Sequence, residues 1–437
     1  MTRRTKTYRL AAVAAASALV LAACGGGDSD DEKDKKVESK SDGVLTVGSL
    51  LPATGNLSFL GPPEFAGVDL AVQEINAAGG VLGKPVEHVR GDSGGNGPGD
   101  QNIAPEEADK LINADVDAII GAASSGVTTT VIDKILGAGV IEFSPANTST
   151  SFDTKPYDGA DLYFRTAPSD ILQGAVLANL LLQEGRQNVA IISTDDPYGT
   201  TLTEEVSKNL EAGGSQLALD AQYFGSGSDN YDTQVDAIAQ ASPDAVVVIA
   251  FNETVDIIPA LTAAGVGPDA LPTYFVDGNT AEYNDDPADP EDAALPAGAL
   301  VGVKGTIPGA QAPDEFRQRL LGVDPSLTDF SYSAESYDAV IVTALAAIAA
   351  DTDKADEVAT EIPGVTKEGT KCTTFTDCKA LLEAGEDIDY DGVSGPIELG
   401  STGSPTAASI GIYAYDESNE ISPVDFISGE IPDPSED

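Results

Sequence analysis

A regular alternation of short apolar runs with segments of helical periodicity constrains the fold of this chain more than any other feature. Val44 to Leu51 is an apolar run typical of a buried strand, and apolar positions then recur at helical spacing from Phe65 to Ile75, before Gly79-Gly80. This order continues to Phe143 and starts again after Arg165. Alternating strands and helices predict an α/β fold in which parallel sheets carry helices on both faces.

Two consecutive units of this kind are expected, because residues 44–437 are too many for one core of ordinary size. Each is predicted to be a doubly wound parallel sheet, and the ligands of such sheets bind beyond the carboxyl ends of the strands. The last third of the chain is less regular, so its elements should complete the first two units, and the acidic tail after Pro423 is expected to fray. The predicted strands are 44–51, 86–89, 116–120, 140–143, 189–192, 217–224, 245–250, 272–276, 300–304, 395–399 and 410–415. The predicted helices include 105–114, 127–136, 170–184, 200–212, 231–240, 255–264, 313–321 and 334–350.

The amino terminus has the composition of an export signal. Four basic residues precede an apolar run of 14 residues from Leu10 to Ala23, and a membrane-spanning helix needs roughly 20. Residues 1–23 are therefore predicted to be a signal peptide. The end of this run, Leu21-Ala22-Ala23-Cys24, resembles the lipobox of bacterial lipoproteins, which implies that the Cys24 thiol receives a lipid. The alternative is an ordinary secretory signal with a chance cysteine.

The segment after Cys24 predicts a flexible tether. Residues 25–43, GGGDSDDEKDKKVESKSDG, contain a single apolar side chain, Val37, and cannot bury enough surface to offset the entropy of ordering. Residues 24–43 would hold a globular part on the extracytoplasmic face of the cell membrane, in contact with the membrane only through the lipid.

Cysteine usage agrees with export, and the charge excludes some partners. If Cys24 is lipidated, Cys372 and Cys378 remain, an even number that predicts one disulfide, with two free thiols as the alternative. The formal net charge of −49 argues against a nucleic-acid partner and against an anionic membrane surface. High solubility or a saline habitat is the simpler explanation of this charge.

Signatures of enzymes and metal sites are absent from the sequence. The single histidine, His88, lies in a predicted strand, and no GxSxG elbow surrounds any serine. Gly80 to Pro85 imitates a phosphate loop but lacks its first glycine and its final hydroxyl residue. The Asp- and Gly-rich loop 91–102 suggests calcium, but a flexible surface loop is the preferred interpretation. No enzyme activity, cofactor or metal is predicted, and a secreted hydrolase is the least favoured function.

Two polar loops follow neighbouring predicted strands. GAASSGVTTT, Gly121 to Thr130, opens a helix, and SPANTST, Ser144 to Thr150, offers similar donors. Free backbone N–H groups and the helix dipole at such a position favour an anion. The two loops together are predicted to bind a small carboxylate, with two ordinary capping loops as the alternative.

These residues carry a resemblance to the leucine-isoleucine-valine-binding protein family, which has the type I periplasmic-binding fold of ABC importers. The similar stretches are LPATGNLSFLGPPEFAGVDLAVQEINAAGGVLGKPV, IIGAASSGVT, SPANTST, FRTAPSDILQG, ISTDDPYGT and DGVSGPIEL. The resemblance implies two lobes joined by a three-segment hinge, with the ligand in the cleft between them. The lobes are expected at 44–166 plus 305–394 and at 167–304 plus 395–437.

Matching positions imply a site for a ligand with an α-carboxylate and an α-ammonium. Ser125 matches the serine that holds the carboxylate, and Ala146 and Thr148 match the backbone and hydroxyl partners of the ligand head group. Tyr198 matches a tyrosine that reaches from the second lobe. Asp277 stands where the family commonly has a glutamate that pairs with the ammonium, so the acid is kept but shortened.

Three more positions match family contacts less closely. Phe251 stands where tyrosine is common, Leu60 where an aromatic ring often covers the ligand side chain, and Asp170 at a contact near the hinge. Taken singly, these residues have other interpretations: Tyr198 as a turn residue, Asp277 as a helix cap and Phe251 as core.

The sequence therefore predicts a monomeric solute-binding lipoprotein that delivers a branched-chain or related amino acid to the permease of an ABC importer. A sensor module that signals to a membrane partner is an alternative. So is a receptor for amides, urea or aromatic acids.

Overall fold

The computed structural model describes residues 40–97, 99–154, 156–157, 161–228, 230–284 and 294–432. The predicted signal peptide, Cys24 and the tether as far as residue 39 lie outside the described residues. The last part of the predicted tether lies within them and is bound to the first half of the fold. The backbone N–H groups of Asp42 and Gly43 donate to Asp353 Oδ2 at 3.0 and 2.6 Å, so the tether ends before this point.

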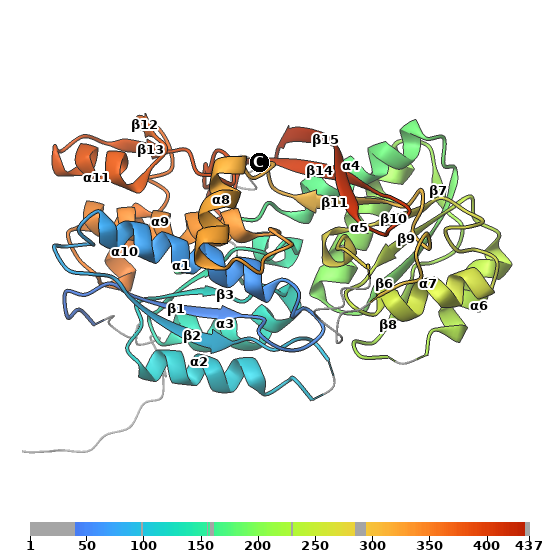
Figure 1. Cartoon of the computed structure of the whole chain (residues 1–437), viewed down its shortest axis with the longest axis horizontal. Coiled ribbons are helices and arrows are strands. Elements are labelled where there is room, and N and C mark those ends of the chain that lie inside the picture. Colours follow the sequence, from blue (N-terminus) through green and yellow to red (C-terminus); the bar gives the residue numbers. More distant parts are fainter. Residues whose placement is uncertain are drawn as a thin grey trace, which may run out of the picture. The chain divides into compact units, whose positions relative to one another are not determined.

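The first sheet is parallel throughout, as predicted, and has the order β2-β1-β3-β4-β5. Its strands are β1 (Thr46–Leu51), β2 (Glu87–Asp92), β3 (Ala118–Gly121), β4 (Ile141–Ser144) and β5 (Tyr163–Arg165). Val47 and Leu51 pack in one cluster with α1 (Gly61–Ala77) and α9 (Ser333–Ala350). Leu50 packs on the other side with α2 (Ile103–Asn113) and α3 (Ser125–Gly137), so this sheet is covered on both faces (Figure 1).

The second sheet is parallel at its centre and antiparallel at one edge. Its order is β15-β14-β11-β10-β9-β6-β7, and β8 also pairs with β6. Its strands are β6 (Asn188–Thr194), β7 (Gln216–Leu217), β8 (Gln222–Phe224), β9 (Ala245–Ile249), β10 (Thr273–Phe275), β11 (Lys304–Pro308), β14 (Ala407–Tyr415) and β15 (Ile421–Glu430). The pairs β11–β14 and β14–β15 are antiparallel. Helices α4 (Asp170–Gln183) and α5 (Pro197–Ala212) pack in one cluster on this sheet, and α6 (Asp232–Ala241) and α7 (Thr254–Ala263) in another.

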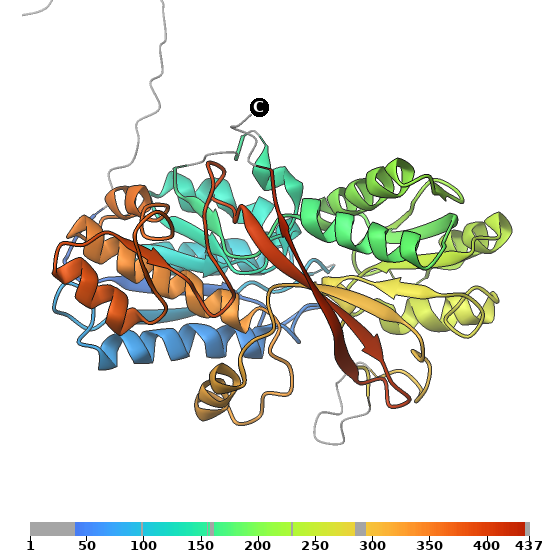
Figure 2. The ribbon, with the colours of Figure 1, turned by 90° about the horizontal axis from the view of Figure 1, so that it is seen from above.

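Several predicted elements need correction. Residues 424–430 do not fray, because β15 extends to Glu430 as the partner of β14 in a long twisted hairpin (Figure 2). The apolar run 300–304 is mostly a turn, and the strand begins at Lys304 instead. The predicted strand 217–224 is two short strands, and 395–399 forms only isolated bridges.

The chain passes between the two sheets three times: after β5, after β11 and before β14. Strand β11 belongs to the second sheet, although the predicted lobe boundary assigned residues from 305 onward to the first lobe. The segment between the second and third crossings packs on the first sheet. It contains α8 (Asp314–Val323), α9, α10 (Ala355–Glu361), β12 (Thr370–Cys372), α11 (Phe375–Glu383) and β13 (Ile388–Tyr390).

Helix α9 is long and apolar enough to cross a membrane by length and composition alone. However, 83% of it is buried inside the protein, where it packs against α1 and the first sheet. Its apolar character is therefore that of a core helix.

The predicted disulfide is confirmed. Cys372 and Cys378 are bonded, with Cα atoms 5.4 Å apart. Cys372 ends β12, and Cys378 lies in the first turns of α11, whose N-cap is Thr374. The bond thus fastens a short strand to the helix that follows it.

Replacing Cys372 and Cys378 by alanine should lower the free energy of unfolding by roughly 2 kcal/mol, the chain-entropy value for so short a loop. Urea titration of both proteins, with and without reductant, measures this. Reductant should destabilise the wild type and leave the double variant unchanged. Equal stability of the two oxidised proteins would contradict the expectation.

Candidate functional site

The first sheet supplies a set of candidate ligand residues at its strand ends. Ser125 is the first residue of α3, the helix that follows β3, and Ser124 caps that helix by accepting from the Val127 N–H. Ala146 and Thr148 lie in the loop after β4, and Leu60 is the N-cap residue of α1. The sequence order of strand, polar loop and helix thus places these groups together.

Buried hydrogen bonds connect the two polar loops. Asn147 Nδ2 donates to the carbonyl oxygens of Ala122 and Ala123 at 3.1 and 2.9 Å, and Ser144 Oγ donates to Ala122 at 2.7 Å. The backbone N–H of Ser149 donates to Ser125 Oγ at 3.3 Å. The Ser125 hydroxyl proton therefore stays available as a donor.

The second sheet contributes its residues in the same way. Tyr198 lies in the first turn of α5, Phe251 lies two residues after the end of β9, and Asp277 begins the 3₁₀ helix Asp277–Asn279 after β10. The rings of Tyr198 and Phe251 stack with centroids 5.3 Å apart. Asp170 is the first residue of α4 and is fully buried.

A small cavity brings six of the eight predicted residues together. It is lined by Leu57, Leu60, Ala123, Ser124, Ser125, Ala146, Tyr198, Phe251, Asp277, Gly278 and Tyr332. Its volume is about 20 Å³, which is room for about one water molecule. A ligand the size of an amino acid therefore enters only when the surrounding walls move apart.

Asp277 is the electrostatic centre of this cavity. Its Oδ1 accepts hydrogen bonds from Tyr198 Oη at 2.8 Å and Gln173 Nε2 at 2.9 Å, and its Oδ2 accepts one from Tyr332 Oη at 2.7 Å. Burial raises the pKa of Asp277, and these three hydrogen bonds oppose the rise. Burial and the Asp277 charge raise the pKa of both tyrosines well above the usual value, so both remain neutral donors.

Sequence reasoning missed Tyr332 and Gln173. Tyr332 stands in a left-handed conformation at the N-cap of α9 and reaches Asp277 from a distant part of the chain. The one local signal was an aromatic residue just before a predicted helix. Gln173 lies on α4, where its helical position alone did not indicate a site.

Thr148 and Asp170 do not line the cavity but lie in the polar layer behind it. The Asp170 backbone N–H donates to the Thr148 carbonyl at 2.7 Å, and Thr201 Oγ1 donates to Asp170 Oδ2 at 2.9 Å. Within the described residues, Thr148 Oγ1, Asp170 Oδ1 and Gln173 Oε1 are buried without a protein partner. Burial, helped by the Asp277 charge, raises the pKa of Asp170 to about 8.

The single histidine takes part in a Ser-His-Asp chain of hydrogen bonds in the first half. His88 Nε2 lies 2.9 Å from Ser49 Oγ, and His88 Nδ1 lies 3.1 Å from Asp69 Oδ1. Ser49 is fully buried in β1, between β2 and β3, so its oxygen is closed to a substrate. The arrangement therefore stabilises the sheet and α1 and does not form a nucleophilic site.

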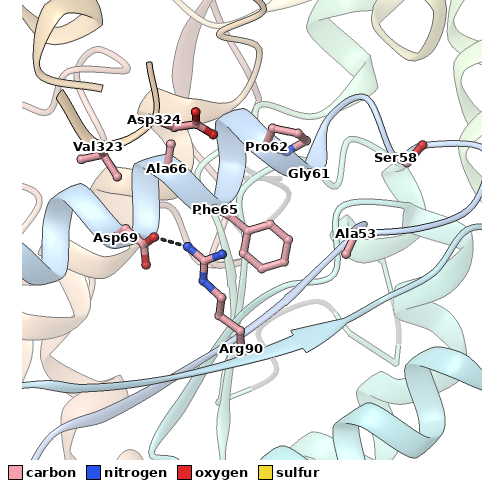
Figure 3. Close-up of a pocket in the computed structure, with 10 residues that line it drawn as sticks. All are labelled: Ala53, Ser58, Gly61, Pro62, Phe65, Ala66, Asp69, Arg90, Val323 and Asp324. Carbon is pink, nitrogen blue, oxygen red and sulfur yellow. Dashed lines mark hydrogen bonds and ion pairs between the residues drawn. The ribbon is translucent and has the colours of Figure 1, made fainter. Parts of the chain in front are cut away.

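A larger pocket of about 400 Å³ lies beside α1, apart from the predicted ligand residues. Figure 3 shows its Arg90, whose guanidinium lies 4.9 Å from the centroid of the Phe65 ring and pairs with Asp69. Because Arg90 already pairs with Asp69, this pocket would attract a charged ligand less strongly than the cavity around Asp277 does.

The described residues contain no group of three or more His, Cys, Asp or Glu arranged to hold a metal ion. In the loop considered for calcium, Asp92 Oδ1 accepts from the backbone N–H groups of Ala53 and Gly94 at 3.0 and 2.8 Å. The Asp92 carboxylate thus stabilises the backbone of the two neighbouring loops.

Comparison with known proteins identifies the family and the fold of this chain. Residues 44–409 match the family model described as periplasmic binding protein. The chain is 26% identical over 371 residues to the chemotactic signal transduction system substrate-binding protein BasB of Halobacterium salinarum, an alignment that spans 81% of this chain and 83% of BasB.

Two solved structures share the fold. The leucine binding protein LivK of Thermotoga maritima superposes with a TM-score of 0.69 at 19% identity, covering 90% of this chain and 100% of LivK. A solute binding protein of an ABC transporter from R. palustris, in complex with benzoate, gives 0.67 at 17% identity and covers 90% and 98%. The matches confirm the family resemblance and the fold class predicted from the sequence.

Replacing Asp170 by asparagine should flatten the pH dependence of stability. The carboxyl titrates near 3.9 when unfolded and near 8 when folded, so the folded state holds a proton that the unfolded state releases. Its stabilisation is complete below about pH 4 and is lost as the pH rises through about 8. Urea titrations between these values should give Asp170→Asn a slope smaller by up to about 1.4 kcal/mol per pH unit. An unchanged slope would show that Asp170 is already ionised.

Proposed function

The chain belongs to the periplasmic binding protein family, and we propose that it is the extracytoplasmic receptor of an ABC importer for a small branched-chain or related amino acid. The family consists of substrate-binding proteins and not of enzymes. The proposal is that this member closes two lobes around the ligand and performs no covalent chemistry.

The hydrogen bonding of Asp277 carries the ligand assignment. The described side chains that donate to this buried carboxylate are all neutral: two tyrosine hydroxyls and one amide. A buried charge is costly unless it is paired as well as hydrogen-bonded. A ligand ammonium in contact with Asp277 would supply the missing positive charge.

The opposite wall suits the other end of an amino acid. The N-terminus of α3 presents free N–H groups and a positive dipole end, and Ser125 adds a hydroxyl donor that lines the cavity. A ligand carboxylate there would face Ser125 and the Ala146 loop. Donors on one wall and an acid on the other select a zwitterion.

The rest of the cavity favours a short apolar side chain. Leu57, Leu60 and the stacked rings of Tyr198 and Phe251 form its apolar surface. LivK, whose name states leucine binding, has the same fold, which agrees with an aliphatic side chain.

Two other functions have specific support. The stacked aromatic pair and the benzoate complex of the R. palustris protein favour an aromatic acid, but such a ligand would bring an anion to Asp277. The name of BasB connects a relative to chemotactic signalling, and a sensor would use the same binding site as an importer component.

Attachment to the membrane is part of the proposal. The motif around Cys24 and the polar segment after it support a lipid anchor that keeps a monomeric receptor near its permease. Mass spectrometry of Cys24 in a membrane fraction would test this, and a mature chain without a lipid would contradict it.

Isothermal titration of the purified protein with single amino acids, urea, an amide and benzoate tests the ligand class. We expect a branched-chain amino acid to bind, and Ser125→Ala and Asp277→Asn each to weaken binding at least tenfold. Ser125→Ala loses a hydrogen bond to the ligand carboxylate, whereas Asp277→Asn keeps an acceptor oxygen but loses the charge that would face the ligand ammonium. A hydrogen bond to a charged group is worth about 1.5–3 kcal/mol, and tenfold corresponds to about 1.4 kcal/mol.

Asp256→Asn is the matched control, because it removes one carboxylate from the exposed face of α7 in the same half. Its affinity should equal that of the wild type. Binding of urea or benzoate with no binding of any α-amino acid would refute the ligand class. Unchanged affinity in both site variants would refute the site.

A further inference from the structure

We propose that Asn56 and Asn96 form a latch that holds the two halves of the binding site together and thereby sets how long the ligand stays bound. Both residues touch neighbouring loops and neither lines the ligand cavity, so they act as positioning residues. The effect on the ligand rests on the function proposed above, whereas the latch itself is tested without any ligand.

The latch consists of amide donors on the side of the first sheet and carboxylate acceptors on the side of the second. Asn96 Nδ2 donates to Asp196 Oδ2 at 2.7 Å, and Asn56 Nδ2 donates to Glu253 Oε1 at 2.9 Å. Asn56 and Asn96 follow β1 and β2, and Asp196 and Glu253 follow β6 and β9. The hydrogen bonds therefore connect strand ends of different sheets.

The two asparagines are fixed to each other by close backbone contact. The Asn96 N–H donates to Asn56 Oδ1 at 3.1 Å. A Cβ atom on Gly55 would lie 2.4 Å from the Gly95 nitrogen, and one on Gly95 would lie 2.3 Å from Asn56 Oδ1. Both positions therefore require glycine, and this requirement accounts for part of the glycine content of the two loops.

Asn96 also connects the latch to the carboxylate end of the site. Its Nδ2 donates to Ser124 Oγ at 2.9 Å, and Ser124 is the N-cap of the helix that begins with Ser125. The side chain lies against Gly126, where a Cβ would approach Nδ2 to 2.9 Å. One amide group thus joins Ser124 on one side of the cleft to Asp196 on the other.

The two carboxylates that accept these hydrogen bonds, Asp196 and Glu253, are also bonded to the segments that carry Tyr198 and Phe251. Asp196 is the N-cap of α5 and accepts from the Gly199 N–H at 2.8 Å, which fixes the turn that carries Tyr198. Glu253 Oε2 accepts from the Phe251 N–H at 3.1 Å. When the latch is closed, the elements that carry Ser125, Tyr198 and Phe251 are held in one arrangement.

Neutral donors suit a reversible latch. Burial raises the pKa of Asp196 to about 6, and the charge of Glu253 adds to the rise. Each amide donates one hydrogen bond to a carboxylate oxygen and lacks the strong charge attraction that a lysine would add. Opening exchanges these hydrogen bonds for hydrogen bonds to water, so the closed population is set by a small free-energy difference. Apparent affinity scales with that population.

Distance measurement between the halves tests the latch without a ligand. Spin labels at the exposed residues Asn113 on α2 and Asp236 on α6 report the separation by double electron–electron resonance. Asn96→Ala and Asn56→Ala should shift the ligand-free distribution to longer distances than in the wild type. Asn96→Asp, which sets a carboxylate against Asp196, should shift it further.

Gln101→Ala is the matched control, because it removes an amide from the same loop that does not bind Asp196 or Glu253. Its distance distribution should match that of the wild type. Thermal unfolding separates latch loss from misfolding, and Asn56→Ala keeps the test valid if Asn96 variants fold poorly. Distributions that stay unchanged in the Asn96 and Asn56 variants would overturn the latch.

Stopped-flow dissociation of L-leucine tests the consequence for binding. In Asn96→Ala the dissociation rate constant should rise about five- to fiftyfold, with the association rate constant within about twofold of the wild type. A dissociation rate within twofold would overturn the effect on the ligand. If the wild type does not bind L-leucine or any other amino acid, the proposed function fails, and the distance distributions still decide the latch.

Discussion

The buried pair of Arg165 and Asp153 is the interaction on which the site most depends. Arg165 ends β5 and is fully buried, and its Nη2 donates to Asp153 Oδ1 at 2.6 Å. Its other donors reach the backbone of the SPANTST loop at Asn147 and Ser149 and the hydroxyl of Ser404. Asp153 in turn accepts from Ser169, the N-cap of α4, at 2.6 Å.

This network joins the first and third crossings between the sheets to a loop that carries candidate ligand residues. Breaking one partner of such a pair costs about 3–5 kcal/mol, because it leaves an uncompensated buried charge. The cost keeps the crossing segments and the loop in one geometry. The residues of the proposed latch lie outside this network.

The sequence predicted the parallel sheets because their strands are short, apolar and separated by amphipathic helices, a local pattern. It did not predict β5, which has only three residues, or β15, whose exposed polar residues resemble a loose tail. Both strands exist because a partner strand pairs with them, β4 with β5 and the preceding strand β14 with β15. Leu300 and Val303 are buried in a turn, which produced the false strand at 300–304.

The candidate site was predictable where residues follow strands and only partly predictable elsewhere. Ser125, Ala146, Tyr198, Phe251 and Asp277 stand at strand ends, so topology and the family resemblance together indicated them. Tyr332, Gln173 and Asn96 act through contacts made only in the folded chain. From the sequence, loop 91–102 was interpreted as a flexible surface loop. In the structure, however, Asn96 of this loop donates a hydrogen bond to Asp196 in the opposite half.

The central claim is that the neutral donors around Asp277 select a ligand with a positive charge. Its most direct measurement is mass spectrometry of the small molecule that copurifies with the natively isolated protein and is released by denaturation. The account predicts an α-amino acid with a short apolar side chain. A copurifying solute without a basic nitrogen, such as an aromatic acid, would contradict it.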